Sequence, residues 1–267
     1  MNSDKSEYSA IFKFTKDRFQ GITVYSENEV NYDIKTFCIK LEKSLLKWYE
    51  DGVRTVWFHI SLKYSKWLPI LCENNFRFHR VSVDGNIVVM YRWLPIDKPS
   101  AIPPYAHTMV GVGGIVMNDK NELLVVLQQY NEKEMWKLPG GYVEPQEDLA
   151  DAAVREVYEE TGIQTKFQSC ILFRHTLLAN FSCSDIYFIV HLQPVTNTLN
   201  DNSDEVTAVK WMNIEEYLNH PKVHELNKLF INVFHNYRKN NTEIMKHDII
   251  HPFTRKPCSL YYIEDRI

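Results

Sequence analysis

The chain has 267 residues, enough for two domains, and its 45% hydrophobic content is sufficient for packed cores. Its net charge of −4 argues against a surface that binds nucleic acid nonspecifically. Its five cysteines are scattered without a CxxC pair, which argues against a zinc site and favours a reducing compartment.

Targeting signals are equally sparse. The segment MNSDKSEYSAIFKF has no apolar signal-peptide core, and its acidic residues are atypical of a transit peptide. No apolar run approaches the length of about 18 residues that a membrane span needs. We therefore expect a cytoplasmic protein, with the nucleus or the mitochondrion as alternatives, and no membrane partner.

Residues 20–95 predict an independent α/β unit with helices packed against a sheet. One helix is capped by Asp33 and ends at Asp51-Gly52. A second helix follows Ser61, and Pro69 makes it either start near Trp67 or kink. The expected strands are Gly21–Tyr25, Arg54–Ile60, Phe76–Arg80 and Asn86–Trp93.

Residues 97–106 are rich in proline and predict a linker to a second domain at 107–240. Its first strands, Ile115–Met117 and Leu123–Gln129, are expected to form a hairpin, and Met135–Gly141 to form one strand. Further strands and two helices are expected at Cys170–Thr176, Asp185–Leu192, Val206–Met212, Ile214–His220 and Leu226–Tyr237. From Arg238 onward the chain is mildly basic with interspersed acids, and residues 241–267 are predicted to be a solvated, partly ordered C-terminal extension.

The most informative stretch runs from Gly140 to Ile163 and reads GGYVEPQEDLADAAVREVYEETGI. It predicts a glycine turn, an acidic loop and a helix that ends at Gly162. Ala150, Val154, Val157 and Thr161 form a buried stripe at helical spacing.

The same helix carries a group of acidic residues. Glu156, Glu159 and Glu160 share a different face, and none has a basic residue four positions later. Carboxylates crowded without nearby cations are unfavourable unless a hard divalent cation binds them, which points to Mg²⁺, with Mn²⁺ as an alternative.

These residues resemble the Nudix box, G-x5-E-x7-R-E-U-x-E-E-x-G-U, in which U is a bulky aliphatic residue. The defined positions are filled by Gly141, Glu147, Arg155, Glu156, Val157, Glu159, Glu160, Gly162 and Ile163. The resemblance implies a C-terminal α/β/α sandwich around a mixed sheet.

Residues 1–96 resemble the domain that precedes the Nudix domain in plant ADP-ribose/NADH pyrophosphatases and in an animal Nudix protein encoded antisense to basic fibroblast growth factor. The similar segments are Phe19–Ile22, the VWFHI strand, Phe76–His79 and Tyr91–Pro95. This implies a smaller N-terminal α/β domain shaped like N-acetyltransferases. The loop that would cradle the pyrophosphate of acetyl-CoA is absent from the sequence. The resemblance also implies a homodimer formed through this domain.

The Nudix resemblance implies that Glu156, Glu159 and Glu160 ligate the metal, with the carbonyl of Gly140, or else that of Gly141, as a further ligand. Arg155 is expected to hydrogen-bond to one of these carboxylates and fix its rotamer. Glu147 is expected to cap the first turn of the helix.

Two choices remain for the catalytic base, and two residues are candidates for substrate contact. Glu205, in a polar loop before a strand, or Glu159 would accept the proton. The resemblance to the plant relatives implies that Arg174 meets phosphate or ribose, and that Phe181 stacks on a base unless it belongs to the core.

The resulting functional hypothesis is a Mg²⁺-dependent pyrophosphatase that acts on a nucleoside diphosphate linked to another moiety, such as ADP-ribose or NADH. The alternatives are removal of an RNA 5′ cap or NAD cap, which the net acidity disfavours, and a catalytically idle nucleotide-binding protein.

Overall fold

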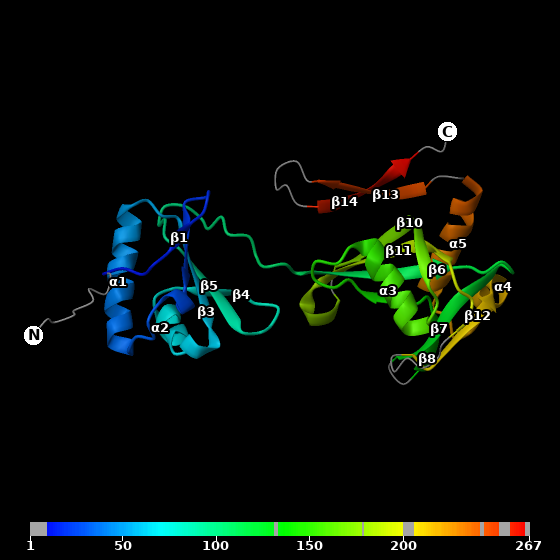
Figure 1. The fold of residues 1–267 in the computed structure, drawn as a ribbon, viewed down its shortest axis with the longest axis horizontal. Coiled ribbons are helices and arrows are strands. Elements are labelled where there is room, and N and C mark those ends of the chain that lie inside the picture. The colour runs from blue at the N-terminus through cyan, green and yellow to red at the C-terminus, as the bar shows by residue number, and fades with distance from the viewer. Residues whose placement is uncertain are drawn as a thin grey trace, which may run out of the picture. The chain divides into compact units, whose positions relative to one another are not determined.

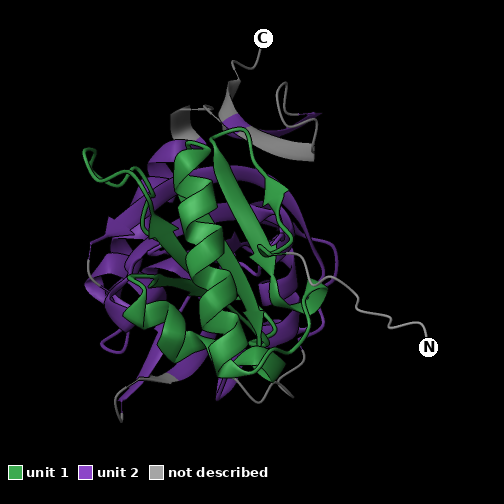
Figure 2. Ribbon diagram, turned by 90° about the vertical axis from the view of Figure 1, so that its left-hand side faces the viewer, with its two compact units in different colours: residues 1–106 green, residues 107–267 purple. Residues whose placement is uncertain are grey.

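The computed structural model describes residues 10–130, 133–177, 179–199, 206–240, 243–250 and 257–264. The chain divides into two compact units, residues 1–106 and 107–267, which Figure 2 shows in different colours. In the described residues each unit has its own hydrophobic core. Within these ranges no helix combines the length and the apolar character that a membrane span requires.

The first unit is a five-stranded sheet with two helices. Its strands follow the order β1-β2-β3-β5-β4; β2 and β3 are parallel, and the other neighbours are antiparallel. The elements are β1 (Thr15–Lys16), β2 (Gly21–Tyr25), α1 (Ile34–Glu50), β3 (Thr55–Ser61), α2 (Trp67–Glu73), β4 (Arg77–Val81) and β5 (Ile87–Trp93).

Local signals place both helices as predicted. The side chain of Asp33 accepts a hydrogen bond from the amide of Thr36 and caps α1, and Gly52 has a φ of 73° just after its end. Pro69 is the third residue of α2, so the helix starts at Trp67 without a kink. Both helices pack on the side of β3 that carries Val56 and Phe58. The likeness to N-acetyltransferases and the homodimer stay predictions.

The second unit holds a six-stranded sheet, β14-β13-β10-β11-β6-β9, and a three-stranded sheet, β12-β7-β8. The larger sheet is mixed, because β11 pairs with β6 in parallel and with β10 antiparallel. The strands and helices up to residue 240 are β6 (Thr108–Val116), β7 (Glu122–Tyr130), β8 (Lys133–Lys137), β9 (Gly140–Tyr142), α3 (Leu149–Thr161), β10 (Thr165–Thr176), β11 (Ser184–Pro194), β12 (Ala208–Asn213), α4 (Ile214–Asn219) and α5 (Glu225–Asn240).

Side chains that alternate along β6 build two separate hydrophobic layers. Val112 and Val116 pack with Val157 of α3, whereas Ile115 packs with Phe230 of α5 and with α4. Helices therefore cover both sides of the sheet region, which confirms the predicted α/β/α sandwich around a mixed sheet (Figure 1).

Two strand predictions for this unit were wrong. The expected hairpin between β6 and β7 pairs only at one bridge, Met117 to Leu123, because the two strands then enter different sheets. Met135–Gly141 is not one strand either. β8 ends at Lys137, and β9 begins at Gly140 in the other sheet.

The C-terminal residues form more regular structure than the solvated, partly ordered extension that the sequence predicted. β13 (Glu243–Ile250) and β14 (Pro257–Glu264) form an antiparallel pair, and Ile244 of β13 pairs with Cys170 of β10. Lys246 and Tyr261 both contact the carboxylate of Asp148, at 3.0 Å each. This C-terminal strand pair, called the tail below, therefore contacts Asp148, the N-cap residue of α3.

Candidate active site

The acidic helix α3 is fixed at both ends by local interactions. Asp148, and not Glu147 as predicted, is the N-cap: its side chain accepts a hydrogen bond from the amide of Ala150 at 2.9 Å. Gly162 closes the helix with a φ of 73°, the left-handed conformation expected there. Val157 and Thr161 of the predicted stripe are fully buried.

The two glycines before the helix make room in different directions. Gly140 has a φ of 150°, and a Cβ atom there would lie 2.1 Å from the carbonyl oxygen of Val112. A Cβ atom on Gly141 would lie 2.6 Å from the carboxylate of Glu156. The first glycine therefore serves close packing of β9 on β6, and the second leaves space beside a predicted metal ligand.

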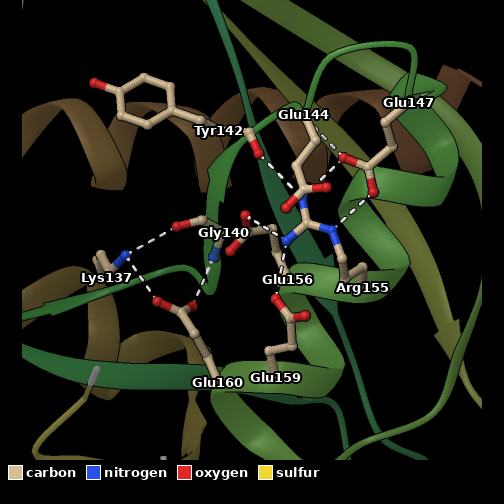
Figure 3. Close-up of polar contacts among 9 residues, drawn as sticks. All are labelled: Lys137, Gly140, Tyr142, Glu144, Glu147, Arg155, Glu156, Glu159 and Glu160. Atoms are coloured by element: carbon tan, nitrogen blue, oxygen red, sulfur yellow. Dashed lines mark hydrogen bonds and ion pairs between the residues drawn. The ribbon is translucent and has the colours of Figure 1, made fainter. Parts of the chain in front are cut away.

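Arg155 lies at the centre of a carboxylate network (Figure 3). Its Nε and Nη2 donate to the two oxygens of Glu147 at 2.7 and 2.9 Å. Its Nη1 donates to Glu156 and to Glu159, both at 2.9 Å, and Nη2 also reaches the carbonyl of Tyr142 at 3.1 Å. Arg155 thus positions more carboxylates than the single one predicted.

This network corrects the expectation that the carboxylates lack nearby cations. The pKa of the Arg155 guanidinium is raised above its ordinary value, and its hydrogen bonds to Glu147 are the largest cause. The same bonds lower the pKa of Glu147. The guanidinium is permanently charged and offsets much of the repulsion within the cluster. The arginine precedes two of its partners on the helix, so a search for basic residues four positions later does not find it.

Glu160 is the most enclosed of the three glutamates, with a side chain only 3% exposed. Its Oε2 accepts a hydrogen bond from the amide of Gly140 at 2.7 Å, and its Oε1 lies 3.2 Å from the Lys137 ammonium. Burial raises the pKa of Glu160 above its ordinary value, although Lys137 and the Gly140 amide act in the opposite direction.

The three glutamates differ in exposure although they share one helix face. Glu156 and Glu160 are buried, whereas the side chain of Glu159 is half exposed. All three, with Arg155, border one open pocket. Its other lining residues come from β7, β8, β9 and the loop after it: Gln128, Lys137, Gly140, Gly141, Tyr142 and Glu144.

Arg174 is not one of the residues that line this pocket. On β10 it donates to Asp185, and its guanidinium lies 5.3 Å from the ring centroid of Tyr187 on β11. The hydroxyl of Tyr187 approaches the glycine turn, because a Cβ atom on Gly140 would lie 3.0 Å from it. Burial, with the charge of Glu160 next, raises the pKa of Tyr187. Arg174 is thus separated from the glycine turn by one aromatic ring.

Phe181 lies in the short turn Asn180–Ser182 and does not belong to the core. Its side chain is 89% exposed, and its backbone is left-handed with a φ of 56°, as is that of Ser182. The neighbouring Asn180 donates its side-chain amide to the hydroxyl of Tyr142 at 3.3 Å. The core alternative for Phe181 was therefore wrong, and the ring is free to meet a ligand.

The potential metal ligands around the helix are of the chemical type that a hard cation prefers. They are carboxylate and carbonyl oxygens, and the Lys137 ammonium already lies between two of them, 3.0 Å from the carbonyl of Gly140 and 3.2 Å from Glu160. The space beside Glu156 is kept open by Gly141. In the described ranges, however, no three acidic, histidine or cysteine side chains surround a single point. The glutamates are instead arranged around Arg155 and Lys137.

Some residues fall outside the prediction or outside the described chain. Glu205, a candidate base, lies outside the described residues. Lys137 and Tyr187 were not predicted as site residues. The sequence indicates Lys137 only weakly as a site residue, through its position three residues before Gly140, at the end of the strand that leads to the turn. Nothing in the single sequence marks Tyr187.

Two family models match the chain. A model described as the NUDIX domain matches residues 107–233, and one described as a Nudix hydrolase domain matches residues 12–94. The chain is similar to plant and animal Nudix proteins, as the sequence resemblance predicted.

Three relatives illustrate this similarity. Nudix hydrolase 8 of Arabidopsis thaliana is 33% identical, over 92% of this chain and 68% of that protein. Nucleoside diphosphate-linked moiety X motif 6 of Homo sapiens is 36% identical, over 75% of this chain and 64% of that protein. Nudix hydrolase 2 of Arabidopsis thaliana is 32% identical, over 82% of this chain and 78% of that protein. The chain therefore belongs to the Nudix hydrolase family.

Proposed function

We propose that the chain hydrolyses a nucleoside diphosphate linked to a second moiety, with ADP-ribose or a reduced dinucleotide such as NADH as substrate. The observation that carries this proposal is the open pocket bordered by Glu156, Glu159 and Glu160, three carboxylates of one helix in a Nudix hydrolase. In the reaction, the oxygen of water bonds to one phosphorus and the bridging P–O bond breaks. The second phosphate leaves with its moiety, and a base accepts the proton of the water.

Glu156, Glu159, Glu160 and the carbonyl of Gly140 would hold Mg²⁺, or Mn²⁺ in its place. When bound, the cation neutralises the pyrophosphate, lowers the pKa of water and stabilises the leaving phosphate. Arg155 holds the carboxylates of Glu156 and Glu159 by hydrogen bonds of 2.9 Å, and so orients two of these ligands.

The proposed base is Glu205 or Glu159. Glu159 is half exposed and borders the pocket, so water can reach its carboxylate. Replacing the true base by glutamine should lower kcat by ~10²–10⁴ at saturating Mg²⁺. A reduction of less than about tenfold in Glu205→Gln would remove Glu205 from consideration.

Two further residues are proposed to contact the substrate. The exposed ring of Phe181 would stack on the base or the nicotinamide. Its neighbour Asn180 contacts Tyr142, which lines the pocket. Arg174 would meet a phosphate or a ribose hydroxyl, although its bond to Asp185 limits how far it can move.

A substrate panel tests the proposal. Purified protein is incubated with ADP-ribose, NADH, UDP-glucose and NAD-capped RNA, with Mg²⁺ or with EDTA, and the products are separated by chromatography. We expect AMP from ADP-ribose or NADH only with Mg²⁺, loss of turnover in Glu160→Gln, and retained turnover in Glu215→Gln, a control on the exposed surface of α4. Cleavage of capped RNA alone would favour the cap-removing alternative. No cleavage of any compound would favour an idle nucleotide binder.

A further inference from the structure

Lys137 occupies a position that has a bearing on cation binding. It is the last residue of β8, and its Nζ lies 3.0 Å from the carbonyl oxygen of Gly140 and 3.2 Å from Oε1 of Glu160 (Figure 3). These two oxygens are among the ligands proposed for the divalent cation. The side chain of Lys137 is 24% exposed and borders the pocket, so its ammonium is accessible to a ligand there.

Both carboxylate oxygens of Glu160 already have a partner, and one partner is a cation. Its Oε2 is held by the amide of Gly140 at 2.7 Å, and its Oε1 faces Lys137. A divalent cation bound to Oε1 or to the Gly140 carbonyl would therefore lie close to the ammonium. Like charges this close repel strongly in a partly buried site. The ammonium and the cation thus compete for the same pair of oxygens.

A lysine can leave such a position without disturbing the fold. Its ammonium is a point charge on a flexible stem of four carbons, unlike the rigid fork of Arg155. Once displaced, it needs a new anionic partner to avoid the loss of a charge-assisted hydrogen bond. A pyrophosphate held in the same pocket supplies such acceptors within the reach of the stem.

We propose that Lys137 is a two-position residue that couples cation binding to phosphate binding. Without a divalent cation it holds Glu160 and the Gly140 carbonyl in place. When the cation binds these oxygens, the ammonium moves to a phosphate of the substrate. This inference rests on the proposed function and adds a second role for the same pocket.

Mn²⁺ binding without substrate tests the first half of the proposal. Isothermal titration calorimetry is performed on the wild type, Lys137→Met and Lys137→Gln, with Lys133→Met as the matched control from the exposed start of the same strand. Removal of the competing charge should increase Mn²⁺ affinity by roughly tenfold, a typical size for groups in contact with ligating atoms. Lys133→Met should bind Mn²⁺ like the wild type.

A decrease or no change in Mn²⁺ affinity in both Lys137 variants would overturn the competition, as would wild-type protein that binds no Mn²⁺ at millimolar concentration. Lys137→Gln guards against a folding defect of the methionine variant, because glutamine keeps a hydrogen-bond donor. A purely structural lysine would lower the melting temperature without raising Mn²⁺ affinity.

Kinetics test the second half. At saturating Mg²⁺, Lys137→Met should raise the KM for the substrate by roughly tenfold or more, and Lys133→Met should not. An unchanged KM would overturn the phosphate contact. If the wild type hydrolyses nothing in the panel, the proposed function fails, but the Mn²⁺ titration still decides whether Lys137 competes with a cation.

Discussion

Replacing Gly141 by alanine should weaken cation binding while it leaves the fold intact. The new Cβ atom would lie 2.6 Å from a carboxylate oxygen of Glu156, whereas ordinary contacts begin at 3.4 Å, so that oxygen must move by about 0.8 Å, the difference between the two distances. Metal–ligand distances tolerate about 0.2 Å. We therefore expect Mn²⁺ affinity to fall ~10- to 100-fold, which corresponds to about 1.4–2.7 kcal/mol.

Gly140→Ala is the matched comparison. Gly141 does not have a positive φ, and its added methyl group meets only the end of a flexible side chain. Gly140 has a φ of 150°, and its methyl group would lie 2.1 Å from the backbone oxygen of Val112. Gly140→Ala should therefore cost about 3 kcal/mol or more in folding stability, and Gly141→Ala less than about 1 kcal/mol.

Two measurements on each variant separate the effects: thermal unfolding by circular dichroism, and Mn²⁺ titration followed by electron paramagnetic resonance. If Gly141→Ala bound Mn²⁺ as tightly as the wild type, Glu156 would not be a ligand in the proposed position. If both alanine variants lowered the melting temperature equally, the different roles of the two glycines would be refuted.

Three further predictions concern residues around the site. Arg155→Met should lower the melting temperature by about 5–10 °C, because partly buried carboxylates lose their shared cation; an unchanged melting temperature would contradict the network. Phe181→Ala should raise the KM for the substrate without altering thermal stability, since the ring is 89% exposed; equal KM values would remove its stacking role. Tyr261→Phe should speed deuterium exchange of the Ala150 amide by loosening the Asp148 cap, whose bond to the tyrosine contributes about 1 kcal/mol; an unchanged exchange rate would show that the tail does not support the helix.

Interactions between residues close in sequence made much of the architecture predictable. Asp33 caps α1 by accepting a hydrogen bond from the amide three positions later. Gly162 ends α3 through its own backbone conformation. Neither feature depends on the rest of the chain. The spacing of the box likewise placed the three glutamates on one helix face, because helical geometry alone fixes that arrangement.

Contacts between distant elements limited the remaining predictions. The sequence cannot reveal that Lys137, on a strand, meets Glu160 on a helix, or that the glycine turn covers a carboxylate face. Adjacency in sequence also suggested a hairpin between β6 and β7, but parallel pairing with β11 draws β6 into another sheet. The basic and acidic side chains interspersed from Arg238 onward predicted a solvated extension, although antiparallel strands satisfy their backbone groups whatever the side chains.

The proposed hydrolysis requires that the glutamates of α3 hold a divalent cation. The most direct test compares Mn²⁺ binding to the wild type and to Glu160→Gln by electron paramagnetic resonance, with Glu215→Gln as the surface control. We expect saturable Mn²⁺ binding to the wild type and to the control, and a loss of at least ~10-fold in affinity in Glu160→Gln. Equal binding by all three proteins would contradict this expectation.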